Sequence, residues 1–262
     1  MPELLEIDGL VVDAHTSQGT LTLLHDFSLS VSAGEVVGLV GESGSGKTTT
    51  IRSIVGLLDS NLSITAGTIS VLGRTVRSPE TENYRAVRGK HVGVVFQGVG
   101  SSLDPLARVG AQIAEVIRRH KPELGKAEVA ALALETIGAM GFADPEQVLR
   151  SYPHELSGGM RQRVLIALAV VTQPELIIAD ECTSALDVTT QKSVIALLSR
   201  LVAERGVGMI FVTHDLMLAQ EICDRICVMR SGRIVELGPT SRVMTTPAEQ
   251  YTRDLLDAIP HW

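Results

Sequence analysis

Long apolar runs are missing from this 262-residue chain. The longest stretch without a polar residue covers about eight residues, 164–171, whereas a membrane-spanning helix needs ~20. The chain also does not open on the basic, apolar and small-residue segments of a secretory signal. These absences predict a globular protein without a membrane span of its own that is not sent across a membrane.

Cysteines, aromatic residues and positive charge are also scarce. Cys182, Cys223 and Cys227 are the only cysteines, too few for a disulfide framework, so we expect small, reduced core residues. Aromatic residues make up 3% of the chain and the formal net charge is −7. A nucleic-acid surface needs a positive field and aromatic rings for base stacking. The composition therefore argues against nucleic-acid binding.

Apolar runs typical of strands recur along the chain. The expected strands cover residues 4–12, 21–31, 36–40, 92–96, 176–179 and 208–213, and the expected helices cover residues 47–58, 109–120 and 126–140, with another from Met160 that Pro174 stops. The first two strands alternate apolar and polar residues and predict an antiparallel edge. The later strands are continuously apolar, which is typical of a parallel sheet with helices on both faces.

The turn after the apolar run at residues 36–40 reads GESGSGKT and fits the pattern G-x-x-x-x-G-K-[ST]. We call residues 41–48 the phosphate loop. Its glycines let successive N–H groups point at phosphate oxygens, and the next helix adds its positive N-terminal end. Lys47 would reach the outer phosphates and the Thr48 hydroxyl would hold Mg²⁺. The residues expected to bind nucleotide here are Gly41, Glu42, Ser43, Gly44, Ser45, Gly46, Lys47, Thr48 and Thr49.

Two acidic residues follow the apolar run at 176–179 directly. An apolar strand that ends in acid is, by itself, often only a strand that meets solvent. Ligands of open α/β sheets bind at the carboxyl ends of the strands, however, and the phosphate loop is expected at the same edge. Asp180 is therefore predicted to hold Mg²⁺, and Glu181 to polarise the water that attacks the γ-phosphate.

The stretch LSGGMRQR, residues 156–163, resembles the signature motif of ABC ATPases. A hydroxyl, two glycines and a helix N-terminus are again offered to a phosphate. The resemblance implies that Ser157, Gly158 and Gly159 contact ATP held by an opposite subunit, so that two subunits enclose two ATP molecules.

Other segments resemble further elements of that family. Gln97 matches the glutamine that senses Mg²⁺ and contacts the membrane subunit, residues 184–187 match the D-loop, and His214 matches the switch histidine that contacts the γ-phosphate. The resemblance thus implies ATP and Mg²⁺ as ligands. It implies Glu181, His214 and Gln97 as catalytic residues, and Thr48, Gln97 and Asp180 as the magnesium ligands.

The resemblance also implies the fold and its organisation. We expect an α/β ABC ATPase fold, in which a P-loop NTPase core with a parallel sheet carries an antiparallel β edge and a helical insertion. The nucleotide-binding core would cover residues 1–97 and 157–240. The helical insertion would cover residues 98–156, and a C-terminal tail would cover residues 241–262.

A narrower resemblance is carried by SSLDP (101–105), HELSGGMRQR (154–163) and QYTRDLLDAIP (250–260). These stretches resemble the peptide and nickel importer branch, although the last could also be an ordinary amphipathic helix. That branch implies a second ATPase subunit, identical or homologous, two permease subunits and an extracytoplasmic solute-binding protein. The chain would then lie at the cytoplasmic face of the plasma membrane. A cysteine-rich extension is absent after the tail, so no iron–sulfur site is expected.

The chain departs from the family pattern at two positions. Cys182 stands where a proline usually follows the catalytic glutamate. Ala14 stands near the position of the aromatic residue that usually stacks on adenine, and the neighbouring His15 could take its place.

Three alternatives to an import motor remain open. A soluble ABC ATPase of DNA repair or translation would usually carry inserted coiled coils, a zinc module or a second ATPase domain. An exporter motor would commonly be fused to membrane spans. A P-loop kinase of a small metabolite would not need the LSGG stretch.

Overall fold

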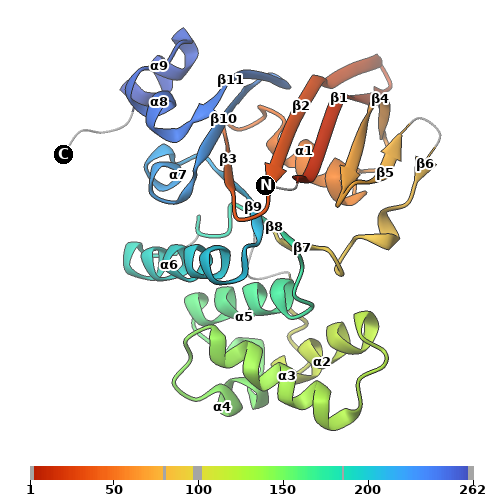
Figure 1. Ribbon diagram of the computed structural model, residues 1–262, viewed down its shortest axis with the longest axis vertical. Helices are drawn as coiled ribbons and strands as arrows, with labels where there is room; N and C mark the ends of the chain where they lie inside the picture. The colour runs from red at the N-terminus through yellow and green to blue at the C-terminus, as the bar shows by residue number, and fades with distance from the viewer. Residues whose placement is uncertain (1–2, 79–80, 97–101, 185, 259–262) are drawn as a thin grey trace.

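The computed structural model describes residues 3–78, 81–96, 102–184 and 186–258. These residues form two β-sheets, helices that cover them, and a group of helices at one end of the molecule (Figure 1).

The first sheet is antiparallel and has the order β2-β1-β4-β5-β6. Its strands are β1 (Glu3–Thr16), β2 (Gly19–Ser32), β4 (Leu62–Val71), β5 (Arg74–Ser78) and β6 (Thr81–Glu82). The pairing of β1 with β2 confirms the antiparallel edge that the sequence predicts. Strands β4 to β6 are not predicted from the sequence. The stretch LSITAGTISV of β4 carries few large apolar side chains, and it becomes a strand by pairing with β1 from Leu5–Val71 to Ala14–Leu62.

The second sheet has the order β11-β10-β3-β9-β8-β7. It consists of β11 (Arg233–Pro239), β10 (Arg225–Arg230), β3 (Val36–Val40), β9 (Gly208–Thr213), β8 (Leu176–Asp180) and β7 (Val92–Val95). All neighbours from β10 to β7 are parallel, and β11 is antiparallel to β10. Every residue of β3, β8 and β9 is buried, as expected of continuously apolar strands inside a parallel sheet.

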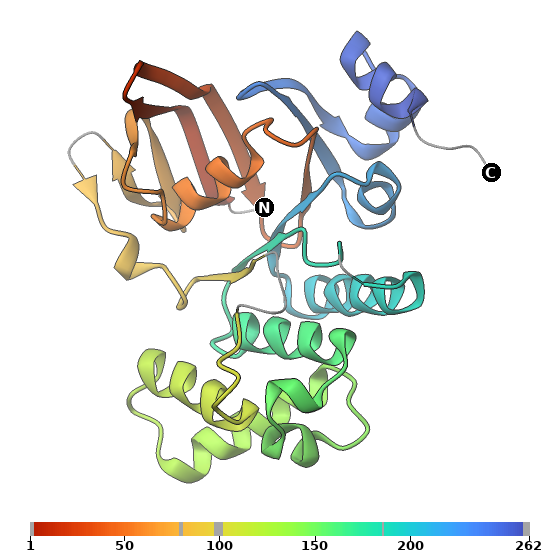
Figure 2. The same ribbon diagram turned by 180° about the vertical axis from the view of Figure 1, so that it is seen from behind.

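Helices cover both faces of the parallel sheet (Figure 2). On one face, α1 (Lys47–Val55) lies in a core that it shares with both sheets, where Ile51 and Ile54 are fully buried. The second core lies on the opposite face and includes buried residues of α5 (Gly158–Val170), α6 (Val188–Arg205) and α7 (Leu216–Ile222). Helix α5 starts two residues before Met160 and ends at Val170, ahead of Pro174.

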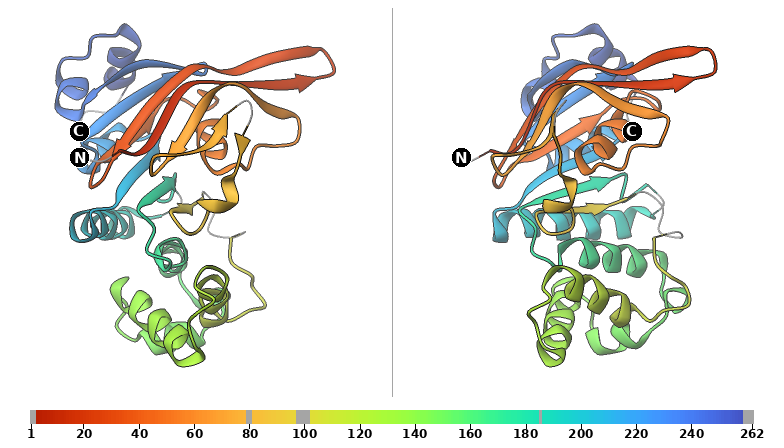
Figure 3. Two further views of the ribbon diagram at one scale, coloured as in Figure 1. Left: turned by 45° about the vertical axis from the view of Figure 1, so that its right-hand side comes forward. Right: turned by 90° about the vertical axis from the view of Figure 1, so that its right-hand side faces the viewer.

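A separate group of helices forms the lowest layer in Figure 1. It consists of α2 (Val109–His120), α3 (Lys126–Ala139) and α4 (Pro145–Arg150), which contact one another, while α2 and α3 also contact α5. Short 3-10 turns lie at Tyr84–Ala86 and Pro153–Glu155. At the other end of the molecule lie α8 (Thr240–Thr245) and α9 (Gln250–Asp257), beside the β10–β11 hairpin (Figure 3). Among the described residues, no helix combines the length and the apolar character needed to cross a bilayer.

Candidate functional site

The strand order of the parallel sheet brings distant residues to one edge. Strands β3, β9 and β8 are neighbours, and their carboxyl ends lead into the phosphate loop, His214 and Asp180–Glu181 respectively. Strand β7 continues this row and leads into Gln97, which lies outside the described residues. The predicted groups that the structure describes at this edge therefore come from three adjacent strands.

The backbone of the phosphate loop depends on glycine. Gly41 has φ +151°, and a Cβ at this position would lie 2.3 Å from the carbonyl oxygen of Met229. Gly46 has φ +109° and is the N-cap of α1, where its lack of a side chain leaves the first N–H groups of the helix open toward an anion. Within the predicted set, Gly41, Ser45 and Lys47 are buried, Gly46 and Thr49 are half-buried, and Glu42, Ser43, Gly44 and Thr48 are exposed.

The ammonium group of Lys47 is held inside the phosphate loop. It donates hydrogen bonds to the carbonyl oxygens of Gly41 (2.7 Å) and Glu42 (2.9 Å). Burial lowers the pKa of Lys47, and the nearby carboxylates of Glu181 and Asp180 oppose this shift. The lysine is thus placed between the loop carbonyls and the acidic pair, where the negative charge of a phosphate would be met by its positive charge.

Asp180 ends strand β8 and is 5% exposed. Burial and the neighbouring Glu181 raise the pKa of Asp180, while Lys47 and Arg52 act in the opposite direction. A buried carboxylate with a raised pKa lacks charge compensation. A cation bound beside Asp180 would supply that compensation.

Glu181 adopts a backbone conformation that side chains rarely take. Its φ is +43°, and its N–H donates to the carbonyl oxygen of Val212 at 3.0 Å. A non-glycine residue in the left-handed region costs on the order of 1–3 kcal/mol and often marks a functional site. Here the turn directs the carboxylate toward His214, so that Glu181 Oε1 and His214 Nδ1 are 3.4 Å apart. The two side chains line a small cavity of about 100 Å³.

The signature stretch starts helix α5. The Ser157 hydroxyl oxygen accepts a hydrogen bond from the Met160 N–H at 3.3 Å and caps the helix. Gly159 leaves no room for a side chain, because a Cβ there would lie 2.4 Å from the Thr190 methyl group. Asp187 caps α6 by accepting from the Thr190 N–H at 3.0 Å. Gly159 is therefore packed against the start of α6. The phosphate loop, in contrast, leads into α1, which belongs to the other core.

Ala14 and His15, the residues near which adenine is expected, belong to strand β1. Ala14 is buried and pairs with Leu21 and Leu62, and the His15 imidazole makes a hydrogen bond of 3.0 Å with the Ser63 hydroxyl. His25, which from the sequence is an ordinary surface or core histidine, has its ring beside Gly232. Gly232 in turn donates to the Ser45 carbonyl oxygen at 2.9 Å. No local sequence signal marks His25, because its place depends on pairing between distant segments.

The three cysteines are free and buried. Burial raises the pKa of Cys182, next to the acidic pair, to about 12. This confirms the prediction that the cysteines are core residues, and it means that Cys182 adds no thiolate to the site at neutral pH.

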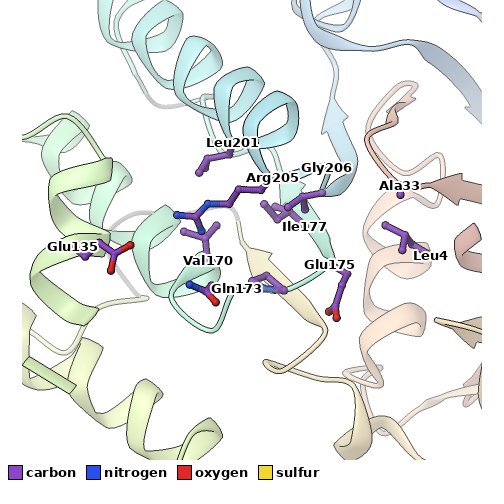
Figure 4. A pocket seen from close by; sticks show the side chains of 12 residues that line it. Leu4, Ala33, Glu135, Val170, Gln173, Glu175, Ile177, Leu201, Arg205 and Gly206 are labelled. Atoms are coloured by element: carbon purple, nitrogen blue, oxygen red, sulfur yellow. The ribbon is translucent and has the colours of Figure 1, made fainter. Parts of the chain in front are cut away.

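A larger cavity of about 560 Å³ lies at the opposite, amino edge of the parallel sheet (Figure 4). It is lined by residues that start β8, by the end of α6, and by Glu135 of α3. None of the predicted site residues that the structure describes belongs to its lining. Size alone therefore does not locate the nucleotide site.

A phosphate loop follows a central parallel strand, and the next two strands end in a histidine and in an acidic pair of which Asp180 is buried. This arrangement defines a P-loop nucleotide-binding protein. Residues 24–184 match the family described as ABC transporter. The chain belongs to this family and is an ATP-binding ATPase. The family and the fold predicted from the sequence are thereby confirmed.

Curated relatives align with 98% of the chain. The peptidoglycan transport ATP-binding protein YejF of Agrobacterium fabrum is 43% identical, and the chain spans 47% of its length. The dipeptide transport ATP-binding protein DppD of Lactococcus lactis is 37% identical, with 74% of its length covered. The oligopeptide transport ATP-binding protein OppD of Escherichia coli is 39% identical, with 76% covered.

Solved structures agree with this assignment. The ATP-binding cassette MJ0796, in a dimeric post-hydrolysis state with ADP and phosphate, matches with a TM-score of 0.78 and 27% identity. The match covers 90% of this chain and 98% of that one. This chain therefore has the fold of that ATP-binding cassette, and that protein was observed as a dimer.

Proposed function

We propose that this chain powers a multi-subunit ABC importer for peptides, nickel or a related small solute. Relatives that transport dipeptides and oligopeptides, by their names, align with nearly the whole chain and support this proposal. The ATPase would work with a second ATPase subunit, two permease subunits and an extracytoplasmic solute-binding protein. It would lie at the cytoplasmic face of the plasma membrane, held there by the permeases.

The geometry supports a role for each predicted side chain. Lys47 and the N–H groups of the phosphate loop would bind the outer phosphates of ATP. Glu181 would accept a proton from the attacking water, and His214 would orient that carboxylate and contact the γ-phosphate. Ser157, with Gly158 and Gly159, would contact the ATP held by the partner subunit.

The residues present also fit a magnesium ion. Asp180 offers a buried carboxylate whose charge is poorly compensated, and the Thr48 hydroxyl lies at the exposed side of the loop. Gln97 would complete the protein ligands. Bound there, Mg²⁺ would neutralise negative charge on the phosphate oxygens.

An apolar groove offers a contact surface for a permease. It has a volume of about 280 Å³ and lies beside β7, α5 and α2, next to the segment that leads into Gln97. Leu57 and Phe96 line it, and they are 42% and 36% exposed. Exposed large apolar side chains in a groove favour a protein partner. We expect this groove to receive an apolar segment of a permease subunit.

The test is affinity purification from detergent-solubilised membranes, with identification of the proteins that accompany the tagged chain. The native chain should recover permease polypeptides. Leu57→Asp should reduce their recovery by about tenfold or more, since it places an unpaired charge in the groove. Leu134→Asp is a matched control, because Leu134 is 38% exposed on α3 and does not line the groove. The proposal fails if no membrane protein accompanies the native chain, or if both variants recover permeases equally.

Nucleotide choice gives a second expected result. With Ala14 buried and His15 bonded to Ser63, the base should add little to binding, since base–aromatic stacking is typically worth ~1–3 kcal/mol. We expect ATP and GTP to bind within about tenfold of each other. Competition binding with both nucleotides measures this in the native chain, in His15→Ala and in His25→Ala. A strong preference for ATP that survives both substitutions would show that another group reads the base.

A further inference from the structure

The C-terminal helix α9 is anchored to strand β11 by a buried carboxylate. Glu236 is 4% exposed and accepts hydrogen bonds from the backbone N–H groups of Ala248 (2.9 Å) and Glu249 (3.3 Å). Thr252, on the first turn of α9, is fully buried. These bonds therefore fix the start of α9 to the β10–β11 hairpin. The helix lies beside this hairpin at the upper end of the molecule in Figure 1.

This anchoring places Tyr251 against the phosphate loop. The Tyr251 side chain lies beneath the guanidinium of Arg230, whose Cζ is 4.6 Å from the ring centroid. The residue is 9% exposed, and its phenol oxygen is buried near the backbone of Glu42 without a hydrogen bond to the described residues. Tyr251 and Arg230 line, with residues 42–45, a cavity of about 220 Å³.

A second path joins the same helix to the loop. Ser231 and Gly232 form the turn between β10 and β11, and Arg230 is the last residue of β10 before it. We call residues 230–232 together the 230–232 turn. The Gly232 N–H donates to the Ser45 carbonyl oxygen at 2.9 Å. Arg230 thus connects the Tyr251 ring to a turn that is hydrogen-bonded to the phosphate loop. The direct path runs through Glu42 and the indirect path through Arg230.

We infer that Tyr251 is a positioning residue for the phosphate loop, acting through Glu42 and the 230–232 turn. The loop contains three glycines with positive φ, which gives it many alternative conformations when it is unsupported. Tyr251 restricts these alternatives before phosphate arrives, so less ordering is left to occur on binding. Tyr251 is in this way part of the ATP-binding machinery. The inference rests on the ATP-binding function but not on the identity of the transported solute.

The experiment compares variants of the isolated full-length chain by equilibrium binding, with Mg-ATP and inorganic tripolyphosphate as probes. Tyr251→Ala should weaken both by about tenfold, because the defect lies in the phosphate loop and not in the contact with the base. Tyr251→Phe keeps the ring beneath Arg230 and should stay within about twofold of the native affinity.

Leu255→Ala is the matched control for general loosening of α9. Leu255 is half-buried and packs against the second core, the one that includes residues of α5, α6 and α7. It does not line the cavity beside the phosphate loop. It should lower the melting temperature while leaving both affinities unchanged. The inference is overturned if Tyr251→Ala binds both probes like the native chain, or if Leu255→Ala produces the same loss. A native chain that does not bind Mg-ATP would instead contradict the nucleotide site itself.

Discussion

Glu181→Gln is expected to lower ATP turnover by about 10²–10⁴-fold while Mg-ATP still binds. The substitution preserves the size of the side chain but removes the carboxylate that would accept a proton from water. The φ of +43° at Glu181 and its 3.4 Å approach to His214 hold this carboxylate at the edge where the phosphate loop opens. Phosphate release from the assembled complex measures turnover, and equilibrium binding measures nucleotide affinity.

The chain contains a matched control for this substitution. Glu175 also pairs with a histidine, at 3.0 Å from His91 Nδ1, but it lies just before strand β8 begins. Glu175→Gln removes the same charge and a similar ion pair at the opposite edge of the sheet. It should leave turnover within about twofold of native, since exposed pairs contribute at most ~1 kcal/mol. Unchanged turnover in Glu181→Gln would refute the assignment of the base.

Ser157→Arg is expected to lower the rate of ATP hydrolysis by about 10²-fold or more without weakening ATP binding to the isolated subunit. The phosphate loop would already surround a phosphate with its own backbone and Lys47. Ser157 is exposed at the start of α5, a helix that packs in the other core. A second anion-binding helix start at that distance has no evident use within the same subunit. If each helix start completes the nucleotide site of the opposite subunit, a bulky arginine blocks the one site that it faces.

Mixing subunits distinguishes this arrangement from one within a single chain. Ser157→Arg and Lys47→Ala should each be inactive alone. Combined, they can form one intact site, from the phosphate loop of the first and the signature stretch of the second, and part of the turnover should return. If the native chain pairs with a homologue, the homologue takes the place of one variant. Ala131→Arg, on the exposed face of α3, controls for the added charge and bulk. Weaker ATP binding by the isolated Ser157→Arg subunit would mean that the motif acts within its own chain.

Local signals in the sequence were sufficient for much of the parallel core. The runs at β3, β8 and β9 are almost entirely apolar. The phosphate loop carries the local pattern G-x-x-x-x-G-K-[ST]. Helices α2 and α3 were predicted at nearly their observed bounds. These features depend on residues close together in the chain, so a short window contains their cause.

Strands β4, β5, β6, β10 and β11 were missed because pairing, and not composition, makes them strands. Strand β4 is rich in serine, threonine and glycine, and β10 carries an arginine at each end. Strand β4 gains its hydrogen bonds from β1 and β10 from β3, which are distant in sequence, and β5, β6 and β11 then extend these strands as hairpins. A window that covers one strand does not contain its partner.

The local order of residues accounts for the chemical groups that this protein carries and for the turns and helix starts that present them. Which of these groups meet depends on the folded arrangement of the whole chain. The order β3-β9-β8 brings the phosphate loop, His214 and Glu181 to one edge, and the anchoring of α9 places Tyr251 beside Glu42. Strand order and helix docking follow from burying apolar faces over the whole chain at once, so no local pattern specifies them.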